Sequence, residues 1–412
     1  MNTIRTRERL CHQMAFVSTL TLFFLVQREP LDGQELPVRR LQMGVAEVDI
    51  TPRLGTPMAG YYSPRGADGV HDPLMAKAMV LNDGTTKLAL VSLDIIKTTP
   101  KMVGDARELI ASRAGIPADA VLIAATHSHT GPIIINDSKR ENDFGGSSSQ
   151  AQEFATRLPE WIAQSVEAAA KSVEPIDLSL TTGHCKGVAF NRRFHLRNGA
   201  VGWNPGKLNP LIVRAAGPVD EDLPILLFTR IDGKRKAGLI NYSIHLDTVG
   251  GTQVSADIPG DLARILKETV NADFFSLYFT ACCGDVNHID VSRGGAQKGH
   301  TEAARIATIL AASTLTSLEL TKPVQSVRLA HRSRRIQLPT YRVRLWQRVN
   351  CSSENQKTSN QLPLFEKSLR LIVQLISPTI NINRGKSKYR FSRLEIRRPL
   401  LAYPERFSSN LA

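Results

Sequence analysis

The sequence has few cysteines and, beyond its first residues, no long apolar run. Five cysteines in 412 residues are too few for a scaffold held together by disulfides. After the apolar segment at 14–26, no stretch is long enough to cross a membrane as a helix. Phosphate-binding glycine loops, a Walker motif, a GxSxG nucleophile elbow and internal repeats are also absent. What remains is the pattern of a large globular protein whose chemistry lies outside these common motifs.

The positive charge is concentrated at one end of the chain. Residues 341–412 contain 14 Lys and Arg against 4 Asp and Glu, so they carry +10 of the total +14. This segment has no aspartate and one glycine, Gly385, and it lacks a sustained period, so we expect an irregular, poorly ordered basic tail. A change of reading frame near Thr340 would also explain its composition. Binding of lipid or nucleic acid through the tail is disfavoured because the tail lacks a patterned basic face, and we predict no nucleic-acid partner.

The N-terminus has the pattern of an export signal. Arg5, Arg7 and Arg9 precede the apolar segment 14–26, which polar residues follow. This order is typical of a signal peptide, and the apolar run is short for a transmembrane helix. No small-residue cleavage site is evident, so residues 1–34 are predicted to be either a signal peptide or an uncleaved anchor. The predicted localisation is secreted or periplasmic, with membrane attachment if the segment is retained.

Between Met43 and Thr340 the pattern alternates between strands and helices, which predicts one catalytic-type domain over 43–340. The fold class is α/β, a mixed sheet flanked by helices. Asp232-Gly233 predicts a hairpin turn between two of the strands. The expected strands are 87–93, 121–125, 225–229, 237–244 and 274–280, and the expected helices are 104–114, 150–173, 259–270 and 299–318.

The most informative segment is Val121-Leu122-Ile123-Ala124-Ala125-Thr126-His127-Ser128-His129-Thr130-Gly131-Pro132. An apolar strand runs into two histidines spaced i, i+2, which point to the same side of extended backbone. Rigid strand ends are common positions for metal ligands and catalytic groups. Two hydrogen-bonded structural histidines are the alternative for this pair taken alone.

Three more segments place polar residues at strand or helix ends. His245 follows the expected strand 237–244; alone it fits a structural role, but as a third strand-end histidine it is a candidate zinc ligand. Asp257 can start a helix or hold a ligand imidazole by its second nitrogen. Asp285 follows the strand 274–280, in a turn or an active-site loop. The adjacent Cys282 and Cys283 favour a buried thiol pair over a zinc site.

Together these segments resemble the N-terminal catalytic region of the neutral/alkaline non-lysosomal ceramidase family. Several of them are more similar to bacterial relatives that carry this domain than to characterised ceramidases. The matching segments, in the family's order, are Gly44-Val45-Ala46-Glu47-Val48-Asp49-Ile50-Thr51-Pro52, Met58-Ala59-Gly60-Tyr61, Val91-Ser92-Leu93-Asp94, Thr126 to Pro132, Asn191-Arg192-Arg193, the His245 segment, Ser255-Ala256-Asp257 and Gly284-Asp285-Val286-Asn287.

The resemblance implies a ceramidase catalytic-domain fold and a secreted zinc amidase that cleaves the N-acyl bond of ceramide. His127 and His245 match the two histidine ligands of Zn²⁺. His129 matches the motif's second histidine, near the scissile amide, while Arg192 and Asp285 match polar residues of the active-site loops. The implied partner is a lipid amide such as ceramide, reached through contact with a membrane surface.

Two departures from the family pattern qualify this function. Asn287 stands where the family carries a serine regarded as the nucleophile, and an amide cannot serve as one. The family's Glu and Tyr zinc ligands are expected beyond about Thr340, where this chain has no Pro-Gly-Glu segment and no room for an immunoglobulin-like domain. Asp94, Asp247 and Asp285 are possible substitutes. We therefore predict a zinc-dependent amide hydrolase that these changes impair; the alternative is a catalytically silent relative acting as a surface or lipid-binding module.

Overall fold

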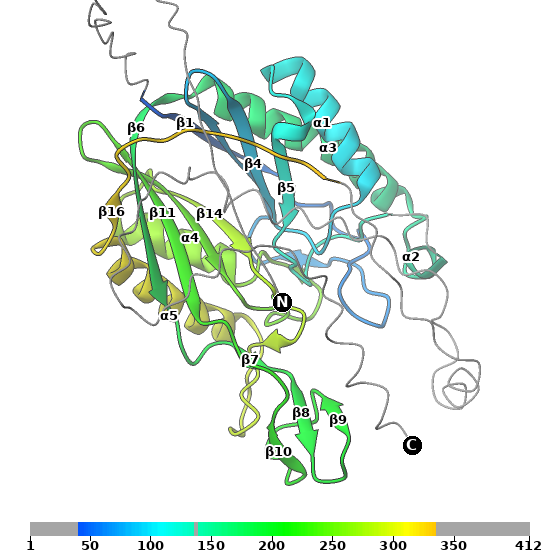
Figure 1. Ribbon diagram of the computed structural model, residues 1–412. Helices are drawn as coiled ribbons and strands as arrows, with labels where there is room; N and C mark the ends of the chain where they lie inside the picture. The colour runs from blue at the N-terminus through cyan, green and yellow to red at the C-terminus, as the bar shows by residue number, and fades with distance from the viewer. Residues whose placement is uncertain (1–39, 136–138, 335–412) are drawn as a thin grey trace, which may run out of the picture. The chain divides into compact units, whose positions relative to one another are not determined.

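The computed structural model describes residues 40–135 and 139–334 (Figure 1). The expected leader at 1–34 and the basic tail at 341–412 lie outside the described residues. In the described part, no helix combines the length and the apolarity that crossing a membrane requires.

The central element is a nine-stranded sheet in the order β14-β12-β11-β6-β1-β3-β4-β5, with β16 beside β6. Its neighbours are antiparallel except β12 with β14 and β4 with β5, which are parallel. The expected mixed sheet is therefore confirmed. Its strands are β1 (Gln42–Asp49), β3 (Met75–Asn82), β4 (Lys87–Leu93), β5 (Val121–Ala125), β6 (Glu174–His184), β11 (Asp222–Arg230), β12 (Arg235–Tyr242), β14 (Phe275–Thr280) and β16 (Lys322–Pro323).

This sheet is divided into two halves at the junction of β1 and β6. Those strands share only the pairs Gln42 with Pro175 and Met43 with Glu174. Beyond the junction the halves face each other, since β14 contacts β3, β4 and β5. The buried Ser92 hydroxyl of β4 donates a 2.6 Å hydrogen bond to the carbonyl oxygen of Tyr278 in β14. The halves therefore form the two inner layers of the fold.

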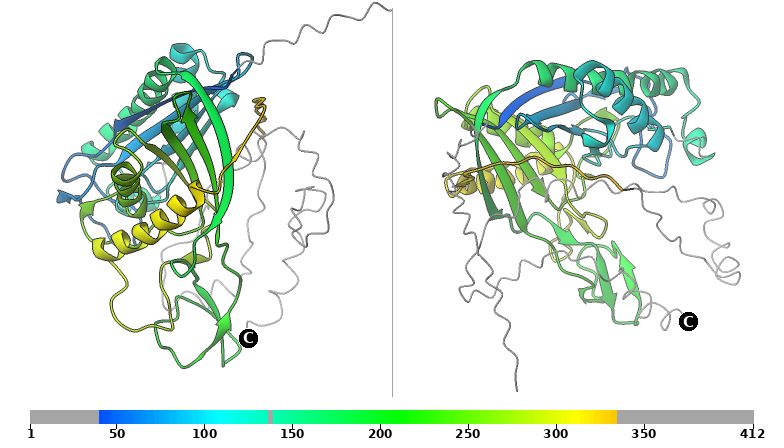
Figure 2. Two further views of the ribbon diagram at one scale, coloured as in Figure 1. Left: turned by 90° about the vertical axis from the view of Figure 1, so that its left-hand side faces the viewer. Right: turned by 45° about the horizontal axis from the view of Figure 1, so that its top comes forward.

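Helices cover the outer face of each half, on opposite sides of the strands (Figure 2). The first half carries α1 (Pro100–Ala114) and α3 (Ser149–Lys171), and the second half carries α4 (Ile258–Thr269) and α5 (His300–Leu318). A 3₁₀ turn, η1 (Ala118–Ala120), precedes β5, and the short α2 (Lys139–Asp143) precedes α3. The flanking helices expected from the sequence are thus present.

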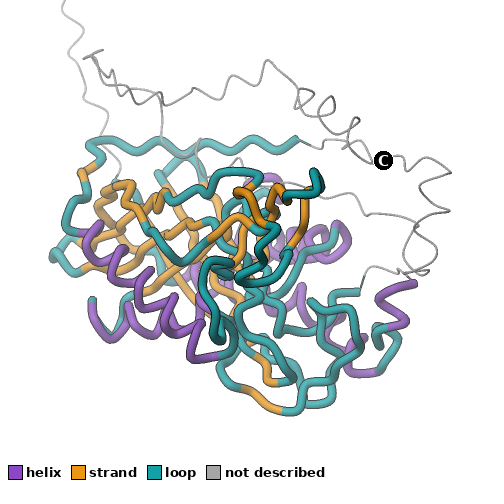
Figure 3. Tube along the Cα trace, turned by 90° about the horizontal axis from the view of Figure 1, so that it is seen from below, coloured by secondary structure: helices purple, strands orange, loops and turns teal. Residues whose placement is uncertain are grey.

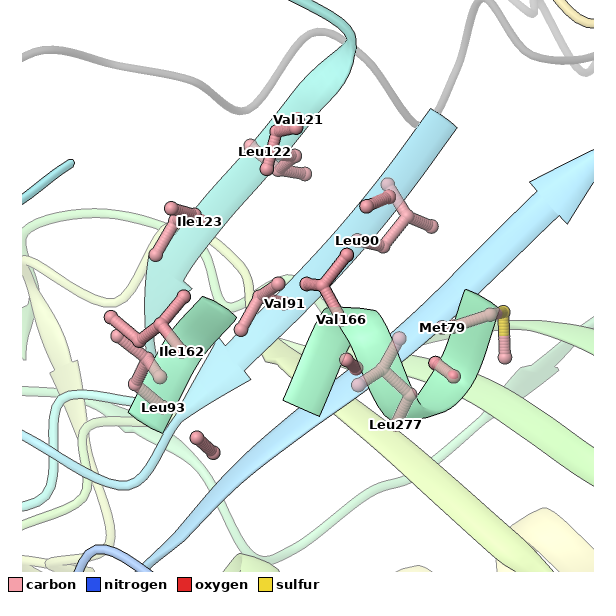
Figure 4. Packing of buried hydrophobic residues seen from close by; sticks show 14 of the residues in the cluster. Met79, Leu90, Val91, Leu93, Val121, Leu122, Ile123, Ile162, Val166 and Leu277 are labelled. Atoms are coloured by element: carbon pink, nitrogen blue, oxygen red, sulfur yellow. The ribbon is translucent and has the colours of Figure 1, made fainter. Parts of the chain in front are cut away.

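The alternation of side chains along β14 shows how the layers are held. Phe275, Leu277 and Phe279 belong to the apolar cluster between the halves and under α3, whereas Phe274 and Tyr278 belong to the cluster under α4 and α5. Figure 4 shows residues of β3, β4, β5, α3 and β14 in the first cluster. A strand with two buried faces needs apolar residues throughout, and each large side chain contributes roughly 1.5–3 kcal/mol.

Helix α1 begins earlier than its apolar pattern indicates. The Thr99 hydroxyl accepts a hydrogen bond from the amide of Met102, and Pro100 occupies the first turn, so the helix starts at Pro100 rather than at Gly104. It ends as expected, at Gly115, whose left-handed φ of 63° terminates the helix.

Short strands that the sequence pattern missed form three small sheets. They are β2 (Gly69–Val70) with β13 (Gln253–Val254), β7 (Phe190–Asn191) with β15 (Val286–Asn287), and the three-stranded β10-β8-β9, with β8 at Arg193–Leu196, β9 at Val201–Trp203 and β10 at Ile212–Ala215. The pairing of β7 with β15 joins the segments that carry Arg192 and Asp285, two of the predicted site residues.

Candidate metal centre

Three histidines meet where the parallel strands end. His127 and His129 follow β5, and His245 follows β12. One ring nitrogen from each lies within 4.8 Å of the others, which makes this the group of possible metal ligands in the described residues. Loops gather at this end of the strands (Figure 3). The structure therefore brings together the strand-end histidines expected from the sequence.

The hydrogen bonds of the imidazoles identify which nitrogens are free. Nδ1 of His127 lies 2.6 Å from the carbonyl oxygen of Ile96, and Nδ1 of His245 lies 3.3 Å from that of Cys283. A carbonyl can only accept, so each Nδ1 carries the proton and each Nε2 presents a lone pair. Backbone carbonyls orient metal-binding imidazoles in the same way.

The Nε2 atoms face one another across the centre. That of His129 lies 3.4 Å from Nε2 of His127 and 3.0 Å from Nε2 of His245. Lone pairs at these distances repel unless a proton or a cation lies between them. Because the donors are imidazole nitrogens, the chemistry of this set fits a borderline metal ion such as Zn²⁺.

The electrostatics keep the three imidazoles neutral. Burial, together with the neighbouring His127 and His245, lowers the pKa of His129 to about 3. Burial lowers the pKa of His245 to about 4 and also lowers that of His127. At neutral pH all three rings therefore keep a lone pair available for a metal.

The backbone around the centre is strained and closely packed. His127 has a left-handed φ of 77°, which a non-glycine residue adopts only under constraint. At Gly60, where φ is 100°, an added Cβ would come within 2.7 Å of the His129 side chain. The Arg65 guanidinium donates a 2.9 Å hydrogen bond to the carbonyl oxygen of His129. These contacts fix the ring positions before any metal arrives.

The partly buried Asp247 and the buried His288 form a pair beside the histidines, for which the sequence predicted no joint role. Asp247 Oδ1 lies 3.4 Å from Nδ1 of His288, whose Nε2 lies 2.8 Å from the carbonyl oxygen of Gln297. Burial acts to raise the pKa of Asp247, but the contact with His288 and the charge of His245 together lower it to about 2. The available signal was the i, i+2 spacing of His245 and Asp247, which repeats that of His127 and His129.

The other predicted site residues lie on two paired segments: Arg192 directly follows β7, while Asp285 and Asn287 lie at β15. The guanidinium of Arg192 donates to the carbonyl oxygen of Gly284 at 2.7 and 3.1 Å, and Asp285 Oδ2 accepts from the Asn191 amide at 3.1 Å. The buried Asn287 amide donates to Asn204 Oδ1 at 3.0 Å and accepts from the backbone of Ile289 at 3.1 Å. Roles in catalysis for Arg192, Asp285 and Asn287 stay predictions, beside these structural contacts.

Of the two roles left open for Asp257, the structure shows the helix start, because Asp257 Oδ1 accepts from the backbone amide of Ile258 at the start of α4 and Oδ2 accepts from that of Val249. The expectation for the adjacent cysteines is wrong. Cys282 and Cys283 are not a buried thiol pair, since Cys282 is exposed and Cys283 is only partly buried.

Asp94, one of the possible substitute ligands, has a structural contact of its own. Its Oδ2 accepts a 3.0 Å hydrogen bond from the backbone amide of Met75, and burial raises the pKa of this carboxyl to about 6. Asp94 therefore contacts the backbone at the end of β4 from within the core.

Comparison with solved structures supports the fold. The neutral ceramidase from Pseudomonas aeruginosa matches 68% of this chain with 19% identity and a TM-score of 0.57, over 45% of its own length. A ceramidase complexed with C2 matches the same share with 19% identity and a TM-score of 0.58, over 44% of its length. The chain thus spans less than half the length of these ceramidases.

The family assignment comes from the sequence match. The model of the neutral/alkaline non-lysosomal ceramidase N-terminal domain matches residues 41–301. This range contains the three histidines, the Asp247–His288 pair and the Asn287 loop. The chain belongs to the neutral/alkaline non-lysosomal ceramidase family.

Proposed function

We propose that this protein is a zinc-dependent amide hydrolase of the ceramidase type, acting on the N-acyl bond of a ceramide-like lipid. The observation that carries the proposal is the convergence of the neutral Nε2 atoms of His127, His129 and His245. Family membership supplies the reaction class and the substrate class.

In this proposal all three histidines hold the metal. Catalytic zinc sites commonly use three protein ligands, and His129 provides the third in place of the Glu and Tyr that the family pattern expects further along the chain. A bound zinc ion supplies Lewis-acid polarisation of the amide carbonyl. The carbonyl oxygens of Ile96 and Cys283 hold two of the rings in the required tautomer.

The residues around the histidines bind and orient rather than attack. The Asn287 amide already has partners in Asn204 and Ile289 and cannot act as a nucleophile, so the proposed attacking group is water. The charge of Asp247 acts on all three imidazoles and favours a cation between them. Arg192, which holds the carbonyl oxygen of Gly284, orients the loop that carries Asp285 and Asn287.

The proposed location is outside the cytoplasm, on the strength of the predicted export signal in residues 1–34. A membrane lipid is a suitable substrate for such a protein, since amphiphiles with an N-acyl chain are held in bilayers.

The direct test measures metal content and activity in the full chain. Reconstituted with Zn²⁺ at neutral pH, the protein is expected to bind about one equivalent by mass spectrometry and to release fatty acid from ceramide in detergent. His184→Ala is a matched control, because His184 is exposed at the end of β6, where its Nδ1 lies 3.0 Å from Asp222 Oδ1. Binding below about a tenth of an equivalent would rule out the metal centre.

The presence of Asn287 favours a second candidate, a catalytically silent relative that acts as a surface or lipid-binding module. It predicts no release of fatty acid from the metal-loaded chain. Release that is lost in His127→Ala and kept in His184→Ala would eliminate this candidate.

A further inference from the structure

The small sheet β10-β8-β9 has a surface of unusual composition. Half of the ten large hydrophobic side chains exposed in the described residues lie between positions 201 and 213. They form what we call the apolar patch: Val201 (41% exposed), Trp203 (54%), Leu208 (64%), Leu211 (44%) and Val213 (58%). Exposed apolar side chains concentrated in one short segment are a feature of interaction sites.

The strand register places apolar and basic side chains on one face. Trp203 pairs with Arg193, and Val201 pairs with His195, which pairs in turn with Arg214. Directly paired residues point to the same side of a sheet. The opposite face carries Phe194, which is buried. The exposed face therefore combines an indole and an aliphatic side chain with cationic groups.

The charge of this region has one sign. Residues 187–219 contain five Lys and Arg and no Asp or Glu. Arg197, Lys207 and Arg214 donate to backbone carbonyls, and within the described residues none of the three is ion-paired with a carboxylate. Their positive charge is therefore available to an anionic partner.

Two residues in and beside the patch have a strained backbone conformation. Leu208 has a left-handed φ of 53°, and Asn204 has one of 44°. The amide of Leu208 donates a 2.7 Å hydrogen bond to the carbonyl oxygen of Val291. Leu208 thus adopts a disfavoured backbone conformation and exposes most of its side chain to solvent. Such strain is typical of functional sites and does not serve packing of the core.

The patch is connected to the metal centre by direct contacts. The Arg192 guanidinium lies 5.2 Å from the centre of the Trp203 ring and holds the carbonyl oxygen of Gly284. The preceding residue, Cys283, orients His245. In Figure 1, β8, β9 and β10 lie below β7, which pairs with the Asn287 strand. Trp203 of the patch is thus linked through Arg192 and the Gly284 loop to the orientation of His245.

We propose that the apolar patch and its basic residues dock the protein on an anionic lipid bilayer, so that the metal centre meets its substrate at the membrane surface. Trp, Leu and Val insert between headgroups while Arg197, Lys207 and Arg214 contact lipid phosphates. This inference deepens the proposed function and rests on it for the identity of the substrate, whereas docking itself can be measured without hydrolysis.

The test is sedimentation of the full chain with phosphatidylcholine vesicles, with and without phosphatidylserine. Leu208→Ser with Leu211→Ser and Val213→Ser is expected to weaken binding roughly a hundredfold. Arg197→Gln with Lys207→Gln and Arg214→Gln is expected to weaken it by a similar factor, and only on vesicles that contain phosphatidylserine.

Matched control variants test whether the effect is specific to the patch, because they remove similar apolar or charged side chains elsewhere on the protein. Leu54→Ser with Ile231→Ser and Leu320→Ser removes three equally exposed apolar side chains elsewhere. Lys101→Gln with Lys139→Gln and Lys171→Gln removes the same charge from exposed helix positions. Both controls are expected to bind as the unchanged protein does, and the basic tail is common to all variants.

Fluorescence gives a readout specific to one residue. With Trp161→Phe and Trp346→Phe, Trp203 is the remaining indole, and its emission is expected to shift to the blue on vesicles and to be quenched by brominated lipid. Unchanged emission, or patch variants that sediment like the unchanged protein, would overturn docking. Loss of self-association or of DNA binding in the patch variants, with vesicle binding intact, would overturn it in favour of those partners.

Failure of docking and failure of the enzyme are distinguishable. If the patch mediates vesicle binding but no fatty acid is released from ceramide in detergent, the proposed function falls and docking stands. If ceramide in detergent is hydrolysed but the patch variants keep full vesicle binding, docking falls and the proposed function stands.

Discussion

The two halves of the sheet build the candidate metal centre in the same way. In the first half His127 follows β5, and its Nδ1 is held by the carbonyl oxygen of Ile96, which follows the parallel neighbour β4. In the second half His245 follows β12, and its Nδ1 is held by the carbonyl oxygen of Cys283, which follows the parallel neighbour β14. A parallel pair thus supplies both a ligand and the group that orients it.

The halves differ at the position two residues beyond each ligand. In the first half this position is His129, whose Nε2 joins the centre; in the second half it is Asp247, a carboxylate paired with His288. One half therefore adds a third neutral donor, and the other adds negative charge. If the proposed metal binds, its affinity should depend on a nitrogen donor from the first half and on a negative charge from the second.

The largest expected effect tests whether the two ligands are equivalent. His127→Ala and His245→Ala should each lower zinc affinity more than about 100-fold, a larger loss than removal of an outer-shell partner causes. Competition with a chromophoric chelator measures the affinities, and His184→Ala should leave them unchanged. A loss confined to one of the two variants would mean that the halves do not contribute alike.

A second prediction concerns the close approach of Gly60 to the first half's extra histidine. In Gly60→Ala the new Cβ falls within 2.7 Å of the His129 side chain, so the ring must move. We expect zinc affinity to fall about 10- to 100-fold and the free energy of unfolding to fall by about 1–3 kcal/mol.

Gly233→Ala is the control for backbone strain alone. Gly233 has a similar φ of 86°, and nothing lies within 4 Å of an added Cβ there. This variant should lose stability in a thermal melt and keep its zinc affinity. Equal zinc affinity in Gly60→Ala and Gly233→Ala would show that His129 is not a ligand.

The approach of Gly60 to His129 is an example of what the sequence does not predict. The strands at 87–93 and 121–125 and the strand-end histidines follow from local patterns, because an apolar run and an i, i+2 spacing are properties of neighbouring residues. The approach of Gly60 to His129 joins positions about seventy residues apart, and the division of the sheet at β1 and β6 depends on packing. Neither leaves a periodic signal.

The undecided role of Asp257 and the missed strands also result from long-range packing that local patterns do not reveal. Asp257 matched both a helix cap and a partner of a ligand imidazole, and the choice between them depended on the backbone carbonyls of Ile96 and Cys283, which no side-chain pattern reveals. β1 and β6 were missed because their partly exposed faces give no clean alternation. β3 was missed because it is mostly buried, and a buried run shows no period of two.

A third prediction compares two buried carboxyls, one from each half. Burial raises the pKa of Asp94 and of Asp257 to about 6, above the ordinary value of 3.8. When the pKa of a carboxyl is higher in the folded protein than in the unfolded chain, the free energy of unfolding falls as pH rises from about 4 to 6. In this range the folded state keeps a proton that the unfolded state has lost.

Asp94→Asn should therefore raise the free energy of unfolding by about 2 kcal/mol at pH 8 and by little near pH 4. Asp257→Asn should gain less, because Asp257 accepts two backbone hydrogen bonds and Asp94 accepts one. Urea titrations at both pH values measure this, and a gain that is the same at pH 4 and pH 8 would contradict the assigned cause.

The smallest expected effect isolates the charge contributed by the second half. Asp247→Asn keeps the size of the side chain and removes the charge that acts on all three imidazoles. We expect zinc affinity to fall about tenfold, the lower end of the range for groups next to a metal's ligands. Asp285→Asn is the matched control, because that carboxylate binds the Asn191 amide and should change zinc affinity less than about twofold. If Asp247→Asn leaves zinc affinity intact while His129→Ala abolishes it, the third donor of the first half outweighs the charge of the second, and the centre is held by its three nitrogens alone.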